Sequence, residues 1–215
     1  MNNVYLKKKL SLAKLNLFEI FSFNILIILN FYLIFSFFGI SLDLIFFSIL
    51  FLSLINFFYI DWKVFFDNFY LLIFFSLFYL VFSVEISTYP YLEWDAAVNW
   101  IFKTLNFKNN YSFQNLENVP GLLGYPHLGT YLWAFFWEIS FIDHEYTGRL
   151  SFIFIYLLIF FSIIERLKIN HLLKIIILIF LIIISFDRIL INGYQEPLMF
   201  SYTGAKSLES IFMLA

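Results

Sequence analysis

The stretch that decides the fold class is FYLLIFFSLFYLVFSVEIS, residues Phe69–Ser87. A helix that crosses a bilayer needs about 20 mostly apolar residues, and this stretch meets that requirement. Further apolar stretches follow the same pattern at Leu17–Phe38, Leu42–Ile60, Leu150–Ile164 and Ile175–Phe186. The sequence therefore predicts an all-α, polytopic membrane helix bundle with about five full spans, plus interfacial helices in a large outer loop.

The composition of the whole chain supports this class. Of its 215 residues, 62% are hydrophobic, 24% are aromatic and only 13% are charged, whereas soluble domains carry about 25% charged residues. The mean hydropathy is +0.87. A net charge of −2 without a basic stretch excludes a nucleic-acid partner. The absence of cysteine excludes disulfides, thiolate catalysis and cysteine-ligated metals.

Charged residues between the spans predict the topology. Lysines within Lys7–Lys14 precede the first span, so the positive-inside rule places the N-terminus in the cytoplasm. Asp61–Asp67 marks a return to the cytoplasm, and the basic cluster Glu165–Lys174 is expected on the same side. The span at Phe69–Ser87 then delivers residues 88–149 to the outer face, periplasmic or extracellular. The protein is thus expected to be an integral, multi-pass membrane protein.

An odd number of crossings must connect the outer loop to Glu165–Lys174, and Leu150–Ile164 supplies one. The apolar run His127–Ile142 is therefore not expected to cross. It contains Glu138, and a carboxylate at mid-bilayer costs about 2.5–3.5 kcal/mol. Its aromatic residues Tyr131, Trp133 and Trp137 favour the headgroup level, and Leu128, Tyr131, Leu132, Phe135, Ile139 and Ile142 fall on one side at helical spacing. We prefer an interfacial helix here, with a true span as the alternative.

A second interfacial helix is predicted at Asp95–Asn106. Asp95, Asn99, Lys103 and Asn106 form one polar stripe at helical spacing. The outer loop 88–149 would then hold two juxtamembrane helices, joined by the Gly/Pro/Asn-rich segment Lys108–Pro126.

Two carboxylates from separate loops are predicted to meet at the outer face. Asp95 begins the first interfacial helix, and Glu196 precedes Pro197 at the start of another helix, where the helix dipole favours an ionised acid. An ionised carboxylate can deprotonate a hydroxyl, and two can hold a divalent cation against a phosphate. The structural alternatives are that Asp95 only caps its helix and that Glu196 only marks a helix terminus.

The order of short motifs in this region is W-D-A at 94–96, Y-P-H-L at 125–128, G-R-L at 148–150 and N-G-Y-x-E-P-L at 192–198. This order resembles membrane glycosyltransferases of the GT-C type, which include protein O-mannosyltransferases and lipid A aminoarabinose transferases. By that resemblance Asp95 matches the first acid, His127 the second position of the P-P element, Arg149 the arginine and Glu196 the second acid. His127 replaces a proline of the family pattern, and Glu196 replaces an aspartate.

The resemblance implies inverting transfer of a sugar from a polyprenyl-phosphate donor to an acceptor at the outer face. Asp95 would act as the base, and Glu196 would assist, through a divalent cation if one binds. Lys103, Arg149 and His127 would bind the lipid phosphate, while Trp94 and Asn99 would contact the substrate. For Arg149 the structural alternative is an anchor that snorkels to the interface.

A non-catalytic membrane protein is the competing interpretation, either a transporter fragment or an assembly subunit of envelope polysaccharide machinery. Transporters usually place ionisable residues within their spans, whereas here the acids gather at one surface. We interpret residues 1–215 as one membrane domain. We expect it to be an N-terminal portion, because Leu198–Ala215 carries Lys206 and Glu209 and does not complete a span.

Overall fold

The computed structural model describes residues 16–40, 44, 51, 54, 62–88, 90–109, 128–140 and 142–186. Within this part of the chain the fold is all-helical, without a strand, as predicted. The elements are α2 (Leu17–Phe37), α4 (Trp62–Asp67), α5 (Phe69–Thr88), the π-helical turn η2 (Ala96–Trp100), α6 (Ile101–Lys108), α7 (Leu128–Ile139), α8 (Glu145–Arg166) and α9 (His171–Ser185).

Helix termini are set by local sequence signals. Asn16 accepts the first backbone bond of α2, from Ile20, while the Glu19 carboxylate accepts from the Asn16 N–H at 3.0 Å, which is one half of a capping box. Beyond the other end of α2, Gly39 adopts a left-handed φ of 70°, and the Ile40 N–H bonds back to Phe35. This is the usual glycine-dependent helix stop. Asn170 caps α9 by accepting from the Leu173 N–H at 2.7 Å.

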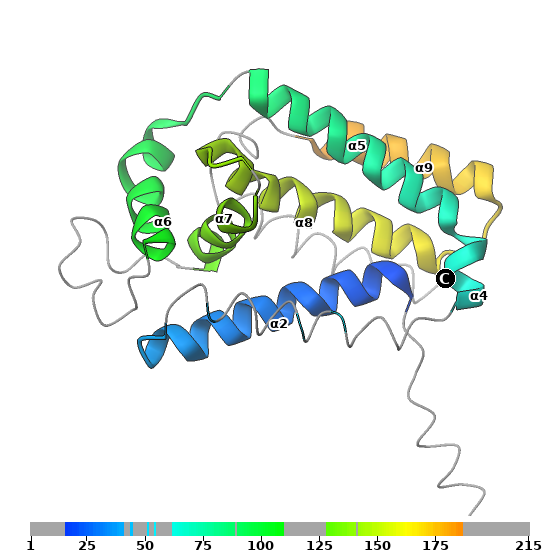
Figure 1. The fold of residues 1–215 in the computed structure, drawn as a ribbon. Helices are drawn as coiled ribbons and strands as arrows, with labels where there is room; N and C mark the ends of the chain where they lie inside the picture. Colours follow the sequence, from blue (N-terminus) through cyan, green and yellow to red (C-terminus); the bar gives the residue numbers. More distant parts are fainter. Residues whose placement is uncertain are drawn as a thin grey trace, which may run out of the picture.

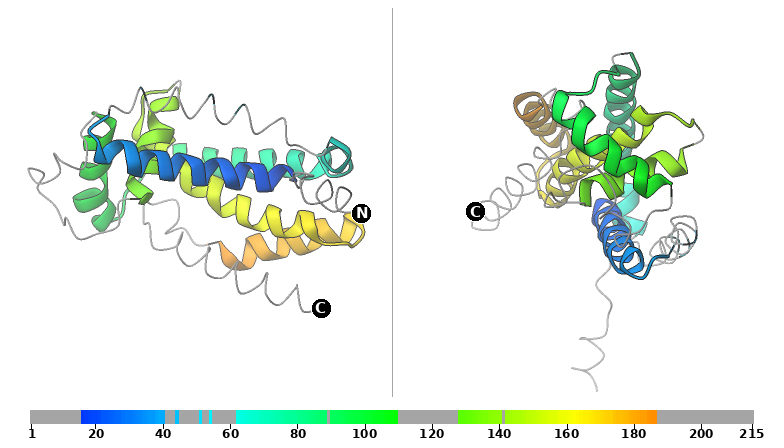
Figure 2. Two further views of the ribbon diagram at one scale, coloured as in Figure 1. Left: turned by 90° about the horizontal axis from the view of Figure 1, so that it is seen from below. Right: turned by 90° about the vertical axis from the view of Figure 1, so that its left-hand side faces the viewer.

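Helix α8 lies at the centre of the bundle. The long helices α2, α5 and α9 run antiparallel to it and pack around it (Figures 1 and 2). The fully buried ring of Phe161 has its centroid 5.2 Å from both Phe18 of α2 and Phe75 of α5. On the α9 side the Tyr156 hydroxyl donates to the Ile182 carbonyl at 3.0 Å. One helix therefore organises the core of the bundle.

The short elements η2, α6 and α7 sit together at one end of the bundle, which we call the α6–α7 end; the opposite end, beside α4, is the α4 end (Figure 1). Helix α6 lies across the bundle end and runs transverse to the long helices (Figure 2). It packs on α7, where Phe107 and Tyr131 stack with centroids 4.0 Å apart. Helix α7 in turn packs on the first turns of α8.

At the α4 end, polar side chains join helices to one another. The Glu165 carboxylate accepts from the Phe18 N–H in the first turn of α2 at 3.2 Å. Arg166 forms a salt bridge with Glu19, with an N–O distance of 2.8 Å. The Lys174 ammonium of α9 donates to the Glu165 carbonyl at 3.2 Å and to Asn68 at 3.3 Å. The starts of α2, α5 and α9 are thus tied to the end of α8.

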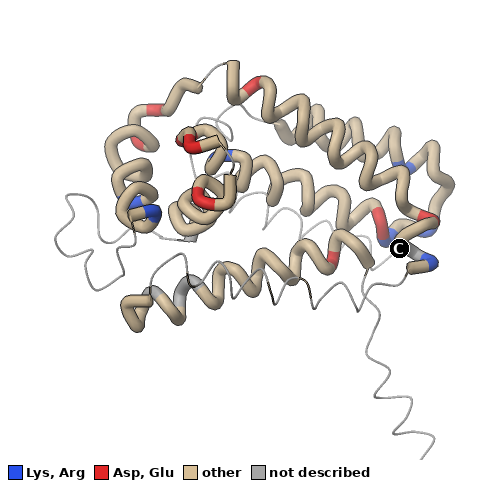
Figure 3. The backbone as a smooth tube through the Cα atoms, in the orientation of Figure 1, with Lys and Arg blue, Asp and Glu red and all other residues tan. Residues whose placement is uncertain are grey.

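Charged residues gather toward the two ends of the bundle, and the lengths between them carry almost none (Figure 3). The sides of the bundle instead expose large apolar residues. On α5 they follow one helical face: Phe69, Ile73, Leu77, Leu80, Val81 and Val84, each 45–61% exposed. On α9 the corresponding face holds Leu172, Ile176, Phe180 and Ile183, each 53–72% exposed. We call these two faces the apolar stripes.

Four of the five predicted apolar runs coincide with helices in the described part of the chain, with shifted ends. Helices α2 and α5 end within one residue of their predictions, whereas α8 is longer than the predicted Leu150–Ile164. Helix α9 begins at His171, before the predicted Ile175. By length and composition, α5 and α8 are able to cross a membrane, while α9 is a shorter apolar helix. The predicted span Leu42–Ile60 lies almost wholly outside the described residues.

Helix α7 differs from its prediction in which of its side chains are buried. Its 12 residues extend about 18 Å, too short for the roughly 30 Å of a bilayer core. Tyr131 and Trp133, predicted at the headgroup level, are buried inside the protein, and Ile139 and Ile142 are exposed. The aromatic pattern was misleading because α6 and α8 cover both sides of α7, a contact that helical periodicity does not reveal.

Candidate functional site

Five of the predicted site residues are described, and all lie at the α6–α7 end: Trp94, Asp95, Asn99, Lys103 and Arg149. His127 and Glu196 lie outside the described residues, as do the segment 110–127 and everything after Phe186. The predicted pairing of Asp95 with Glu196, and a metal site between them, therefore stays a prediction. Among the described residues, no three His, Cys, Asp or Glu side chains form a group that could hold a metal ion.

Asp95 has a fixed orientation. Its carboxylate accepts hydrogen bonds from the Asn99 side-chain amide and from the Trp100 indole N–H, the latter at 3.1 Å. The π-helical turn explains the second bond, because its wider winding brings the side chain five residues later beneath Asp95. Asp95 already has helical backbone angles and makes no capping bond. The interpretation of Asp95 as a simple helix cap is therefore wrong.

Lys103 departs from the predicted polar stripe. Only 3% of it is exposed, because it lies on the face of η2 and α6 that packs against the protein, with Ala96, Trp100 and Phe107. Its ammonium lies 5.4 Å from the centroid of the Trp100 ring, a cation–π distance. Burial lowers the pKa of Lys103 below its ordinary value. Lys103 thus supports the Trp100 ring that binds Asp95, and its ammonium is not presented to solvent.

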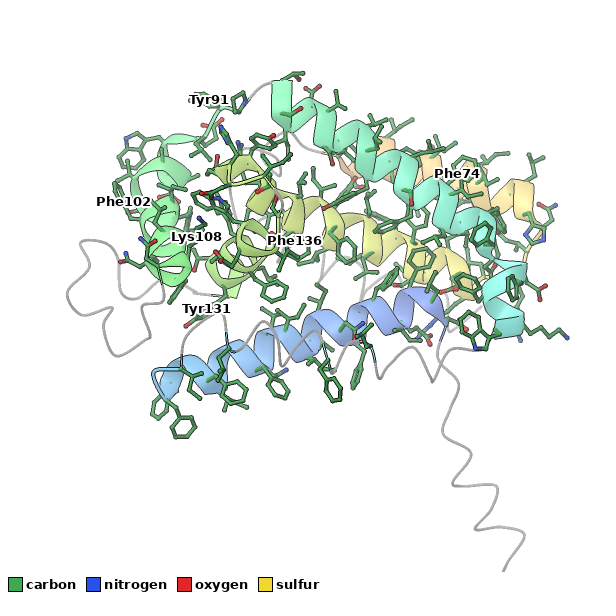
Figure 4. All side chains as sticks on the ribbon, viewed as in Figure 1. Phe74, Tyr91, Phe102, Lys108, Tyr131 and Phe136 are labelled. Atoms are coloured by element: carbon green, nitrogen blue, oxygen red, sulfur yellow. The ribbon has the colours of Figure 1, made fainter. Side chains whose placement is uncertain are left out.

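The outward face of this helical segment is apolar and exposed. Trp94 is 71% exposed, and Val98 and Phe102 follow it at helical spacing. Figure 4 shows Phe102 directed away from the bundle. This face borders the half-buried Asp95 and Asn99. An oriented carboxylate and an amide therefore lie beside an exposed aromatic surface.

Arg149 is fully buried in the first turns of α8. Its Nε lies 2.9 Å from Glu145 Oε1, and its Nη2 donates to Glu145 Oε2 at 3.2 Å. Nη1 donates to the Tyr91 backbone carbonyl at 2.9 Å. The guanidinium therefore does not snorkel to the interface, so that alternative is wrong. Arg149 was also predicted to bind the lipid phosphate, but its guanidinium already binds Glu145 and the Tyr91 carbonyl.

Sequence reasoning missed Glu145, although the spacing of Glu145 and Arg149 by four residues is a recognisable signal of a helical ion pair. It also missed the packing contact of Gly148, which it named only as part of the G-R-L motif. A Cβ at Gly148 would lie 2.3 Å from Trp133 Cδ1 and 2.4 Å from the Trp133 carbonyl oxygen. No short motif indicates this contact, since it depends on how α7 approaches α8.

A second missed cluster joins α6 to the connection between α7 and α8. The Lys108 ammonium lies 2.7 Å from Asp143 Oδ1, and the Trp137 indole donates to the same oxygen at 2.8 Å. Lys108 also lies 4.8 Å from the centroid of the Trp137 ring. The hydrogen bond from Lys108, followed by that from Trp137, holds the pKa of Asp143 below its ordinary value. The residues are distant in sequence, so only the fold brings them together.

The arrangement is able to hold a carboxylate in one orientation at the end of a helix bundle, next to exposed aromatic side chains. A carboxylate of this kind can accept a proton from a hydroxyl or position it for attack. Comparison with protein-family models, with curated proteins and with solved structures found no match for this chain. A function for this chain is therefore inferred from its residues and their geometry.

Proposed function

We propose that the chain is a multi-pass membrane protein that resembles GT-C glycosyltransferases and transfers a sugar from a polyprenyl-phosphate donor to an acceptor at the outer face. The reaction would take place at the α6–α7 end, with the α4 end in the cytoplasm. The observation that carries the chemical part is the Asp95 carboxylate, oriented by Asn99 and Trp100 beside the exposed Trp94.

The apolar stripes support the membrane part of the proposal. Each large apolar side chain left in water forgoes about 1.5–3 kcal/mol relative to burial. Contiguous stripes along α5 and α9 would therefore be costly in a soluble protein. Acyl chains would cover them, while the charged ends would lie at the two water interfaces.

In the proposed reaction Asp95 accepts the proton of the acceptor hydroxyl as that oxygen attacks the anomeric carbon. The bond from that carbon to the phosphate oxygen breaks, and the polyprenyl phosphate leaves with the bonding electrons. Among the described residues Asp95 forms no salt bridge, so its charge is not neutralised within this part of the chain. Glu196 and a divalent cation would add to the site as the resemblance implies.

The test is transfer from radiolabelled polyprenyl-phosphate mannose and aminoarabinose in membranes that contain the chain. Asp95→Asn keeps the shape of the side chain but removes the base, and general-base catalysis is typically worth about 10²–10⁴-fold. The matched control is Asp143→Asn, which removes a carboxylate at the same end and should keep transfer within about twofold. Equal transfer by the Asp95→Asn variant and the unaltered chain would rule out the base assignment.

A non-catalytic membrane protein is the second candidate, and the contacts of Arg149 favour it. A cation that pairs with Glu145 and the Tyr91 carbonyl has a structural role whether or not a reaction takes place. This candidate predicts no transfer by the unaltered chain from either donor. It also predicts that Asp95→Asn changes only the stability of the α6–α7 end.

A further inference from the structure

We infer that Arg149 is a positioning residue for Asp95, which it serves by holding the backbone that leads into η2. The inference rests on the proposed function, because Asp95 needs a fixed place only if it acts on a substrate. It assigns Arg149 a role different from the phosphate binding that the resemblance implies.

The segment before Asp95 lacks the regular bonds of a helix. Residues 90–93 are non-helical and connect the end of α5 to the helical turn at Trp94. The Arg149 guanidinium donates to the Tyr91 carbonyl in this segment at 2.9 Å. This bond ties the connection to the centre of the bundle, only one helical turn of sequence before Asp95.

Arg149 is itself held rigidly. The Glu145 carboxylate accepts one hydrogen bond from Nη2 at 3.2 Å and lies 2.9 Å from Nε as an ion pair, and a charge-assisted bond of this kind is stronger than a neutral one. The backbone of Glu145 is fixed in turn, because its carbonyl accepts from the Trp133 indole at 3.3 Å. The tight contact between Trp133 and Gly148 locks α7 to the same turn of α8.

These contacts disfavour a direct role for Arg149 in binding an anion. The side chain is 0% exposed, and a phosphate would have to displace the Glu145 carboxylate from a buried ion pair. Breaking such a pair leaves an uncompensated charge in a region of low dielectric. Arg149 therefore acts on the site through the position of the Tyr91 backbone.

The chain contains no cysteine, so a distance measurement can be designed without background labels. Spin labels at Trp94→Cys and Ile142→Cys, both exposed positions, report the distance from the Asp95 turn to the start of α8. A reference pair at Leu77→Cys and Ile183→Cys reports the packing of α5 and α9. Electron–electron double resonance in lipid nanodiscs measures both distributions.

The informative variants are Arg149→Met alone and Arg149→Met combined with Glu145→Gln. The double variant leaves no unpaired buried charge, so it should fold even if the single variant does not. We expect at least a doubling of the width of the Trp94–Ile142 distribution in the double variant, with the reference pair unchanged. Arg166→Met, at the other end of α8, is the matched control and should leave both widths unchanged.

A Trp94–Ile142 distribution in the double variant as narrow as in the unaltered chain would overturn the inference, because Arg149 would then serve only to neutralise Glu145. Broadening of both pairs would also overturn it, since the role would be general packing. The measurement uses no sugar donor. The distance measurement can therefore support the role of Arg149 even when the transfer assay detects no product. Failure of this inference and failure of the proposed function are thus distinguishable.

Discussion

Helix α8 carries an arginine near each end, and the two lie in opposite surroundings. Arg149 is fully buried and pairs with Glu145 of its own helix. Arg166 is half exposed, with 49% of its side chain open, and pairs with Glu19 of α2. The two ion pairs have nearly the same shortest N–O distance, 2.9 and 2.8 Å, but they differ in burial.

This difference indicates at which end of the bundle the fold depends on charged side chains. At the α4 end, the half-exposed Arg166 and the buried Glu165 and Lys174 join helices that apolar packing already holds together. At the α6–α7 end, Arg149 of a largely buried pair donates to the non-helical backbone at Tyr91. Substitutions of the two arginines should therefore lower the stability of the protein by different amounts.

The largest effect is expected for Arg149→Met. It leaves the Glu145 carboxylate, whose side chain is 17% exposed, without its partner, and the cost of breaking a fully buried pair, about 3–5 kcal/mol, is the upper bound for this one. Arg166→Met breaks an exposed pair, which is worth about 0–1 kcal/mol. Unfolding of both variants in mixed micelles with increasing SDS gives the comparison. Similar losses at the two ends would show that burial does not distinguish the two arginines.

A smaller effect is expected for Gly148→Ala, which places a methyl group against the Trp133 backbone and ring. Overpacking of this kind typically costs about 1–3 kcal/mol. The control is Ser151→Ala, about one turn later on α8, whose buried hydroxyl makes no hydrogen bond in the structure. Loss of that hydroxyl should be neutral or slightly stabilising. The same unfolding assay tests the pair, and a tolerated Gly148→Ala would contradict the close contact of α7 with α8.

The smallest effect is a pH dependence at the α6–α7 end. The bond from Lys108 depresses the pKa of Asp143 in the folded state, so the stability it contributes is present above the ordinary aspartate pKa of about 4. That stability is lost as the pH falls through the depressed value. Asp143→Asn should therefore flatten the fall of Tm on acidification below about pH 4. An unchanged slope would show that the bond between Lys108 and Asp143 adds nothing in solution.

The sequence predicted the elements of the bundle because apolar length and charge placement act locally. Helices α2 and α5 follow directly from their apolar runs, and the five described site residues lie at one end of the bundle. Asp95 was correctly placed in a helical segment beside Asn99. Its orientation by Trp100 was not predicted, because a π-helical turn changes the spacing at which side chains meet.

Burial at the α6–α7 end could not be predicted from the sequence. Lys103 and Arg149 look like surface cations by residue type, but their positions are decided by how α6, α7 and α8 pack together. The same packing buries Trp133, which was predicted to lie at the headgroup level. Helical periodicity shows which residues share a face, and it does not show what covers that face.

The central claim is that the sides of the bundle face lipid while its ends face water. Leu77→Cys, in the middle of the α5 stripe, tests it most directly, because this position is 53% exposed in the structure. We predict that a water-soluble maleimide leaves Leu77→Cys unlabelled in native membranes and labels Phe102→Cys at the α6–α7 end. Rapid labelling of Leu77→Cys would contradict the account, since the stripe would then face water.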